Sequence, residues 1–189
     1  LGTDGRKEVL FQRYLGVVGE MARRLAPLPA DQTVFEPINE PDQDWFSTFA
    51  AMDRWPAQLA ALHAAARKAA PDLALVMTGA RGGGIDGLLR LDPKPFAGDR
   101  NLIWSFHYYE PMAVTHSGQP WEVTPGRFLT HLPYPAQALD AAQAERLLAA
   151  ARRRIEAGVP DAGKRRELSA AVGKALAAYR ASKAGPEAI

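Results

Sequence analysis

Cysteine is absent from all 189 residues, so disulfide bonds and thiolate chemistry are excluded. The compartment stays open, because both exported and cytosolic proteins can lack cysteine. No apolar run reaches the roughly eighteen residues that a membrane-spanning helix needs, and we expect no membrane partner. The first ten residues, LGTDGRKEVL, lack both the apolar stretch of a signal peptide and an initiating Met. We therefore expect the chain to be cut at its start.

Charge is distributed unevenly along the chain. Residues 150–189 hold nine Lys and Arg against four Asp and Glu, whereas residues 1–149 hold fourteen against seventeen. A basic segment can bind nucleic acid, but these charges lie on two expected amphipathic helices rather than among stacking aromatic residues. We interpret them as solvated helix faces and expect no nucleic-acid partner.

Hydrophobic spacing predicts an alternation of helices and strands. With 47% hydrophobic and 23% charged residues, the composition is that of a globular domain. The spacing predicts helices over 7–25, 53–71, 140–157 and 163–183, strands over 33–38, 73–78 and 101–109, and a long ordered surface loop from Pro111 to Pro135. Strands separated by helices favour parallel crossover units, as in an open α/β sheet or a (β/α) barrel. Pro37 falls inside a predicted strand, where it costs a ladder bond or requires a bulge.

Polar residues follow each predicted strand. Asn39 and Glu40 follow the first strand, and His107 and Tyr109 end the third. In a (β/α) barrel the carboxyl ends of all strands open onto one face, so we expect these side chains to converge. His107 and Tyr109 stand two residues apart on a strand and are expected to point to the same side.

The stretches NEP, HYYEPM and THSGQPW together resemble family 5 glycoside hydrolases, the cellulase-type (β/α) barrels, and in particular their bacterial endoglucanase-like members. The resemblance spans roughly residues 5–125. It implies an α/β fold, a partial (β/α)8 TIM barrel with three parallel strands and flanking helices, corresponding roughly to barrel strands four to six. Residues 1–189 would then be a single fragment of the catalytic barrel.

The resemblance also implies roles for single residues. Glu40 would be the general acid/base, and Asn39 would bind the 2-hydroxyl of the sugar and help to order the nucleophile. His107 and Tyr109 would line the subsite of the cleaved bond, with Tyr109 donating a hydrogen bond to the nucleophile. The candidate substrate-binding residues are Trp45, His116 and Trp121.

The implied function is hydrolysis of O-glycosidic bonds in a β-linked polysaccharide, by a cellulase-like or endo-β-glucanase-like retaining enzyme. Retention needs a second carboxylate about 5 Å from the acid/base and neither metal nor cofactor. The family's nucleophile is a Glu at the end of the seventh strand, and no matching stretch occurs between Trp121 and Ile189. We therefore expect the isolated chain to be inactive. The alternative is a non-catalytic carbohydrate-binding or remnant domain without a nucleophile.

Several expectations follow from this assignment. The partner is a polysaccharide or oligosaccharide, and the substrate class alone places the parent protein in the periplasm or outside the cell. The sequence does not distinguish glucan from mannan or xylan. Unpaired strands at the edges of a partial sheet favour self-association.

Other interpretations of the same residues stay open. Glu40 could serve only to cap the turn in NEPDQD, and the two indoles of Trp45 and Trp121 could be buried instead of stacking on sugar rings. The trio of His107, His116 and His131 matches no spacing of metal ligands on a helix or strand. GGGIDG at 82–87 fits a dinucleotide fingerprint only formally, and we interpret it as a flexible loop. Trp104 and His63 are expected to pack in the core.

Overall fold

A computed structural model describes residues 5–41, 53–121 and 125–185 of the chain. The chain divides into two compact units, Leu1–Tyr108 and Tyr109–Ile189. The prediction that residues 1–189 form a single fragment of one barrel stays a prediction. Among the described residues, no helix combines the length and apolar character needed to cross a bilayer.

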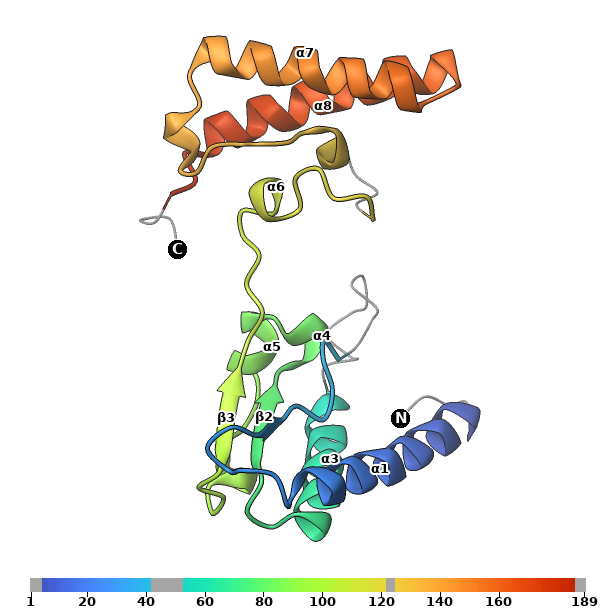
Figure 1. Ribbon diagram of the computed structural model, residues 1–189, viewed down its shortest axis with the longest axis vertical. Helices are drawn as coiled ribbons and strands as arrows, with labels where there is room; N and C mark the ends of the chain where they lie inside the picture. Colours follow the sequence, from blue (N-terminus) through green and yellow to red (C-terminus); the bar gives the residue numbers. More distant parts are fainter. Residues whose placement is uncertain (1–4, 42–52, 122–124, 186–189) are drawn as a thin grey trace. The chain divides into compact units, whose positions relative to one another are not determined.

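The first unit contains a sheet of three parallel strands in the order β1-β2-β3, of which Figure 1 labels β2 and β3. The strands are β1 (Val34–Phe35), β2 (Ala74–Thr78) and β3 (Leu102–Ser105). Val34 is aligned with Ala74, and Leu75 is aligned with Leu102. Three parallel strands with flanking helices confirm the predicted fold class, a partial (β/α)8 barrel.

Strand β1 is shorter than predicted and ends before Pro37. Proline has no backbone N–H for the ladder, so pairing that ends before it avoids the bulge expected from the sequence. The Pro37 carbonyl accepts a hydrogen bond from the Tyr14 hydroxyl at 2.5 Å. This bond connects the segment after β1 to the first helix, and burial raises the pKa of the Tyr14 phenol.

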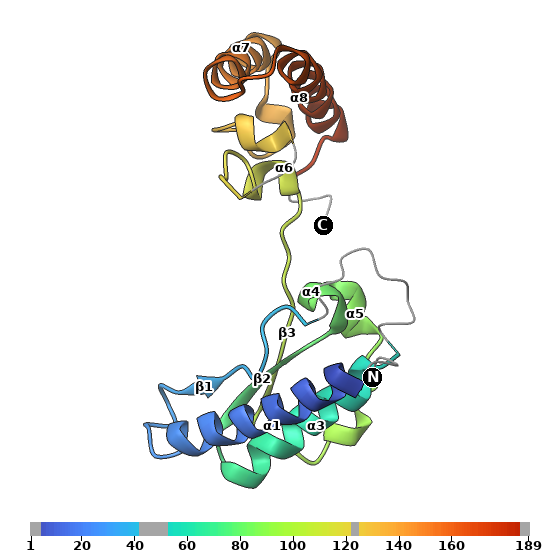
Figure 2. The same ribbon diagram turned by 90° about the vertical axis from the view of Figure 1, so that its right-hand side faces the viewer.

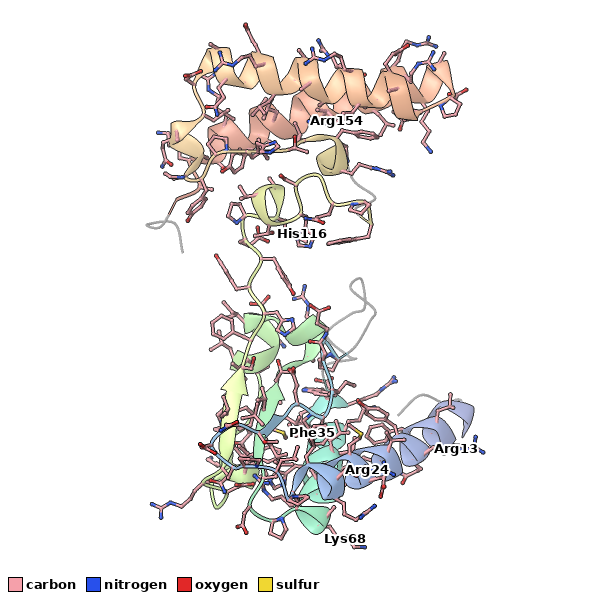
Figure 3. All side chains as sticks on the ribbon, viewed as in Figure 1. Arg13, Arg24, Phe35, Lys68, His116 and Arg154 are labelled. Atoms are coloured by element: carbon pink, nitrogen blue, oxygen red, sulfur yellow. The ribbon has the colours of Figure 1, made fainter. Side chains whose placement is uncertain are left out.

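Helices α1 (Gly5–Leu25) and α3 (Trp55–Ala69) lie side by side against one face of this sheet (Figure 2). Helix α3 begins with Pro56 in its first turn, where a missing N–H is tolerated. Phe35, labelled in Figure 3, packs against the shared core. That core is made by helix and strand residues together: Val18, Ala22, Trp55, Leu59, Leu62, Ala66, Ala70, Leu73, Leu75, Met77, Ala80 and Phe96.

The glycine-rich segment after β2 contains short helical elements, which corrects the interpretation of 82–87 as a loop. It forms two short helices, α4 (Ala80–Gly83) and α5 (Ile85–Leu89). A Cβ atom on Gly79 would lie 2.1 Å from the backbone nitrogen of Leu88, and one on Gly87 would lie 2.1 Å from the Ala80 carbonyl oxygen. These glycines permit a close backbone approach that any side chain would block.

The amino ends of β2 and β3 are linked to α3 by an ion-pair network around Asp99. One Asp99 oxygen lies 2.7 Å from His63 Nε2 and 2.5 Å from Arg67 Nε. His63 therefore has a polar partner in Asp99. It also packs as predicted, through an edge contact with the ring of Phe96 in the 3-10 helix η1 (Lys94–Phe96). Trp104 is 36% exposed rather than in the core, because it lies on the edge strand β3.

The second unit is helical and has its own core. Its long helices, α7 (Ala141–Gly158) and α8 (Ala162–Ser182), pack against each other (Figure 2). Asp140 and Asp161 cap them by accepting hydrogen bonds from backbone N–H groups at 2.6 Å, as the Asp140–Gln143 pattern predicts.

The proline-rich stretch before α7 was predicted to be a surface loop, but part of it is buried. It contains α6 (Met112–Thr115) and two 3-10 helices, η2 (Pro125–Phe128) and η3 (Ala136–Ala138). Phe128, Leu129 and Leu132 pack into the core under α7 and α8. Their apolar side chains hold the stretch in place although it lacks helical periodicity.

Candidate active site

Glu40 and His107 lie together at the carboxyl edge of the sheet. Glu40 follows β1 and His107 follows β3, and parallel strands present their carboxyl ends at the same edge. The Nδ1 atom of His107 lies 2.8 Å from Oε1 of Glu40, although 67 positions separate the two residues in the sequence. The structure thus brings together two of the four predicted catalytic residues.

The backbone at Glu40 has an uncommon conformation. Its φ is 45°, in the left-handed region that residues other than glycine, asparagine and aspartate seldom adopt. Such a conformation costs on the order of 1 kcal/mol and persists where the surroundings impose it, often at functional sites. Here the following residue, Pro41, is buried, and its carbonyl accepts a hydrogen bond from Gly82 N–H at 2.9 Å.

His107 is held by backbone bonds from the glycine-rich segment. Its N–H donates to the Gly83 carbonyl at 2.8 Å, and it forms an isolated parallel bridge with Gly84. Its side chain is 20% exposed, and that of Glu40 is 27% exposed. Both groups are therefore half-buried, close enough to the surface to meet a substrate and shielded enough for their hydrogen bond to hold.

The pair has a defined proton arrangement when Glu40 is ionised. A carboxylate only accepts hydrogen bonds, so His107 must then carry a proton on Nδ1. If Glu40 is protonated, its hydroxyl can instead donate to an unprotonated Nδ1. The arrangement can thus hold one proton at Glu40 or hand it on, which is what a general acid/base requires.

Asn39 and Tyr109 are the other predicted catalytic residues. Asn39 precedes Glu40 and is exposed. Tyr109 begins the second unit, where its ring makes an edge contact with His116 at 5.3 Å between centroids. Thr115 Oγ1 donates to the Tyr109 carbonyl at 2.6 Å and lies 2.9 Å from His116 Nδ1. The convergence of Tyr109 with Glu40 stays a prediction, as do the roles assigned to Asn39, Tyr109 and His116.

Two tryptophans were predicted to bind substrate. Trp121 is 69% exposed in the second unit, so its indole is available for stacking rather than buried in a core. Trp45 lies outside the described residues. The structure therefore shows that Trp121 is exposed, whereas stacking of Trp121 on a sugar ring stays a prediction.

Metal ligation was the alternative considered for three histidines. Over residues 5–41, 53–121 and 125–185, no group of three His, Asp or Glu side chains is arranged to hold a metal ion. His107 belongs to the first unit, whereas His116 and His131 belong to the second.

The sequence interpretation missed the structural role of Gly82, Gly83 and Gly84. Gly82 and Gly83 have φ values of 65° and 74°, which explains why glycine stands at both positions. The available signal was three consecutive glycines directly after a buried strand, a place where backbone often comes close to a site.

Comparison with known proteins supports the fold. No protein-family model matches the sequence, and no curated protein matches it. A solved structure of Thermotoga maritima Cel5A in complex with mannotriose substrate is similar, with a TM-score of 0.56 and 22% sequence identity. The alignment covers 79% of this chain but 44% of the Cel5A chain, so this chain spans less than half the length of that protein. At this identity the likeness concerns the fold alone, a partial (β/α)8 barrel.

Proposed function

We propose that this chain is part of a retaining glycoside hydrolase that cleaves a β-linked polysaccharide, with Glu40 as its general acid/base. The observation that carries the proposal is the 2.8 Å contact between Glu40 and His107 at the carboxyl edge of a parallel sheet. This is the edge on which (β/α) barrels place their catalytic groups. The likeness to Cel5A, solved with mannotriose substrate, supports a glycan as the substrate class.

In the proposed mechanism Glu40 protonates the oxygen of the departing sugar. A second carboxylate, about 5 Å away, attacks the anomeric carbon and forms a glycosyl–enzyme intermediate. Glu40 then acts as a base and removes a proton from the water that hydrolyses this intermediate. We assign the nucleophile to a residue of the longer protein beyond these 189 residues, and Tyr109 to the hydrogen bond that steadies its charge.

We assign substrate binding to further polar and aromatic residues. Asn39 is exposed and can donate its amide hydrogens to a sugar hydroxyl without competing for the transferred proton. Trp121 offers an exposed indole on which a sugar ring can stack. We assign further contacts to Trp45 and His116. Neither a metal nor an organic cofactor enters the reaction, and we propose that the parent protein acts in the periplasm or outside the cell.

The test compares two substrates in the full-length gene product. Glu40→Gln should abolish turnover of polysaccharide, whose leaving group needs a proton, with a loss on the order of 10²–10⁴-fold. Glycosylation by an activated aryl β-glycoside should be spared, because its leaving group departs without protonation. Rapid-mixing measurement of the released aryl group isolates the glycosylation step.

Glu20→Gln is the matched control, since Glu20 lies on the outer surface of α1 and the same chemical change there should alter neither rate. Equal losses on both substrates in the Glu40→Gln glycosylation step would contradict the role as acid/base. Binding of oligosaccharide without hydrolysis by the full-length protein would favour the non-catalytic alternative. The 189-residue chain alone is expected to hydrolyse neither substrate.

A further inference from the structure

Backbone from the glycine-rich segment links the two halves of the candidate site. Gly82 N–H donates to the carbonyl of Pro41, the residue after Glu40, at 2.9 Å. One residue later, the Gly83 carbonyl accepts from His107 N–H at 2.8 Å. Two adjacent residues thus hold both the loop that carries Glu40 and the strand end that carries His107.

Gly83 occupies a gap that excludes a side chain. A Cβ atom built on it would lie 2.9 Å from Thr78 Oγ1 and 3.6 Å from the Cγ and Cδ2 atoms of the His107 ring. The first distance is shorter than real Cβ contacts allow, so one neighbour would have to move. Gly83 is also buried, with a φ of 74° that a side chain would strain.

Thr78 is the neighbour that resists movement. It is 1% exposed and ends the central strand, where its hydroxyl donates to the Ser105 carbonyl at 3.0 Å. Its own carbonyl accepts a hydrogen bond from the buried indole of Trp55 at 2.9 Å. Because Thr78 is held, relief of the 2.9 Å contact should move residue 83 toward the His107 ring, which already lies at contact distance, and should displace the imidazole.

We propose that Gly83 is a positioning residue that places Nδ1 of His107 against the Glu40 carboxylate. Both Thr78 and the His107 ring lie within 3.6 Å of the position that a Cβ atom at residue 83 would occupy, so the absence of a side chain there lets both approach. The geometric part of this proposal concerns the His107–Glu40 contact itself. Its catalytic meaning rests on the proposed function of Glu40.

The experiment reads the protonation of each imidazole nitrogen by long-range ¹H–¹⁵N NMR of the 189-residue chain, assigned with His→Asn variants. In its neutral form, His107 should carry its proton on Nδ1 when this atom faces the carboxylate. Gly83→Ala should abolish that signature for His107. His63 bonds Asp99 at the opposite end of the sheet, so its unchanged spectrum would show that the first unit is still folded.

Two further variants make the result decisive. Gly16→Ala adds a methyl group where nothing lies within 4 Å and should change neither histidine. Thr78→Ala widens the same gap from the Thr78 side without straining φ, and should also disturb His107 while sparing His63.

An unchanged His107 signature in folded Gly83→Ala would overturn the proposal. If the signals of both His107 and His63 are lost in Gly83→Ala, that variant is unfolded and Thr78→Ala becomes the test. An unchanged His107 signature in Thr78→Ala would then overturn the proposal. The measurement needs no activity, so a failed hydrolase assay and a failed positioning role give different results.

Discussion

Asp99→Asn should destabilise the first unit by removing the charge at the centre of the α3–β3 ion-pair network. The Asp99 carboxylate accepts hydrogen bonds from both Arg67 and His63, and its Oδ1 also accepts the backbone N–H of Asn101 at 3.0 Å. The side chains of Asp99 and Arg67 are 14% and 15% exposed, so water screens their attraction only in part. Both Asp99 oxygens face N–H donors, so an asparagine here would turn its own NH₂ group toward one of these donors.

The magnitude follows from the number and type of these bonds. Hydrogen bonds to charged groups contribute about 1.5–3 kcal/mol each, and the losses here overlap because one carboxylate makes them all. We expect a decrease of about 2–4 kcal/mol in the free energy of unfolding, which overlaps the range of about 3–5 kcal/mol for breaking a buried ion pair. Urea unfolding followed by circular dichroism at pH 6 measures it.

The pH dependence supplies the sharper test. Burial of Asp99 acts to raise its pKa, but the hydrogen bonds from Arg67, His63 and Asn101 and the charge of Arg67 outweigh burial and hold the pKa well below 3.8. A group whose pKa is lowered by folding stabilises the protein above its unfolded pKa, and this contribution disappears as pH falls toward the folded pKa. The difference in stability between wild type and Asp99→Asn should therefore shrink steadily as the pH falls from about 5 to about 2.

Asp72→Asn is the control, because Asp72 is exposed near the same end of the sheet and its substitution should change stability by less than about 0.5 kcal/mol. A loss in Asp99→Asn that is the same at all pH values would refute the electrostatic reasoning. A loss as small as that of the control would refute the importance of the network.

Two other predictions concern the second unit and the open sheet. Asp140→Ala should lower the stability of the helical unit by about 1 kcal/mol, because the N-cap acceptor for Gln143 N–H is lost. Asp140→Asn keeps an acceptor oxygen and should retain most of this stability. Thermal unfolding followed by circular dichroism distinguishes the two variants. Strands β1 and β3 lie at the edges of the sheet, with Val34 and Ile103 about half exposed, so the 189-residue chain should self-associate as its concentration rises. Sedimentation that gives a monomer at all concentrations, with one cooperative unfolding transition, would contradict this.

The sequence alone determined the order of the main elements and the class of the sheet. The helix over 7–25 follows from apolar residues at helical spacing, and the strand over 73–78 follows from a continuous apolar run. Both patterns are local, because they reflect which side chains must face the core. Asp140 as a helix cap also follows from local chemistry, because an N-cap bonds a backbone N–H only three residues away. The stretches NEP and HYYEPM predict Glu40 and His107 as site residues from the sequence alone.

Only the tertiary structure decided how these residues meet and what holds them. The contact between Glu40 and His107 spans 67 positions and depends on strand register, which no local pattern specifies. The three glycines at 82–84 are locally compatible with a loop, and only the long-range hydrogen bonds to Pro41 and His107 show that this segment links the two residues. The same holds for Asp99, whose partners on α3 lie more than thirty positions away and become neighbours only when the helix packs on the sheet.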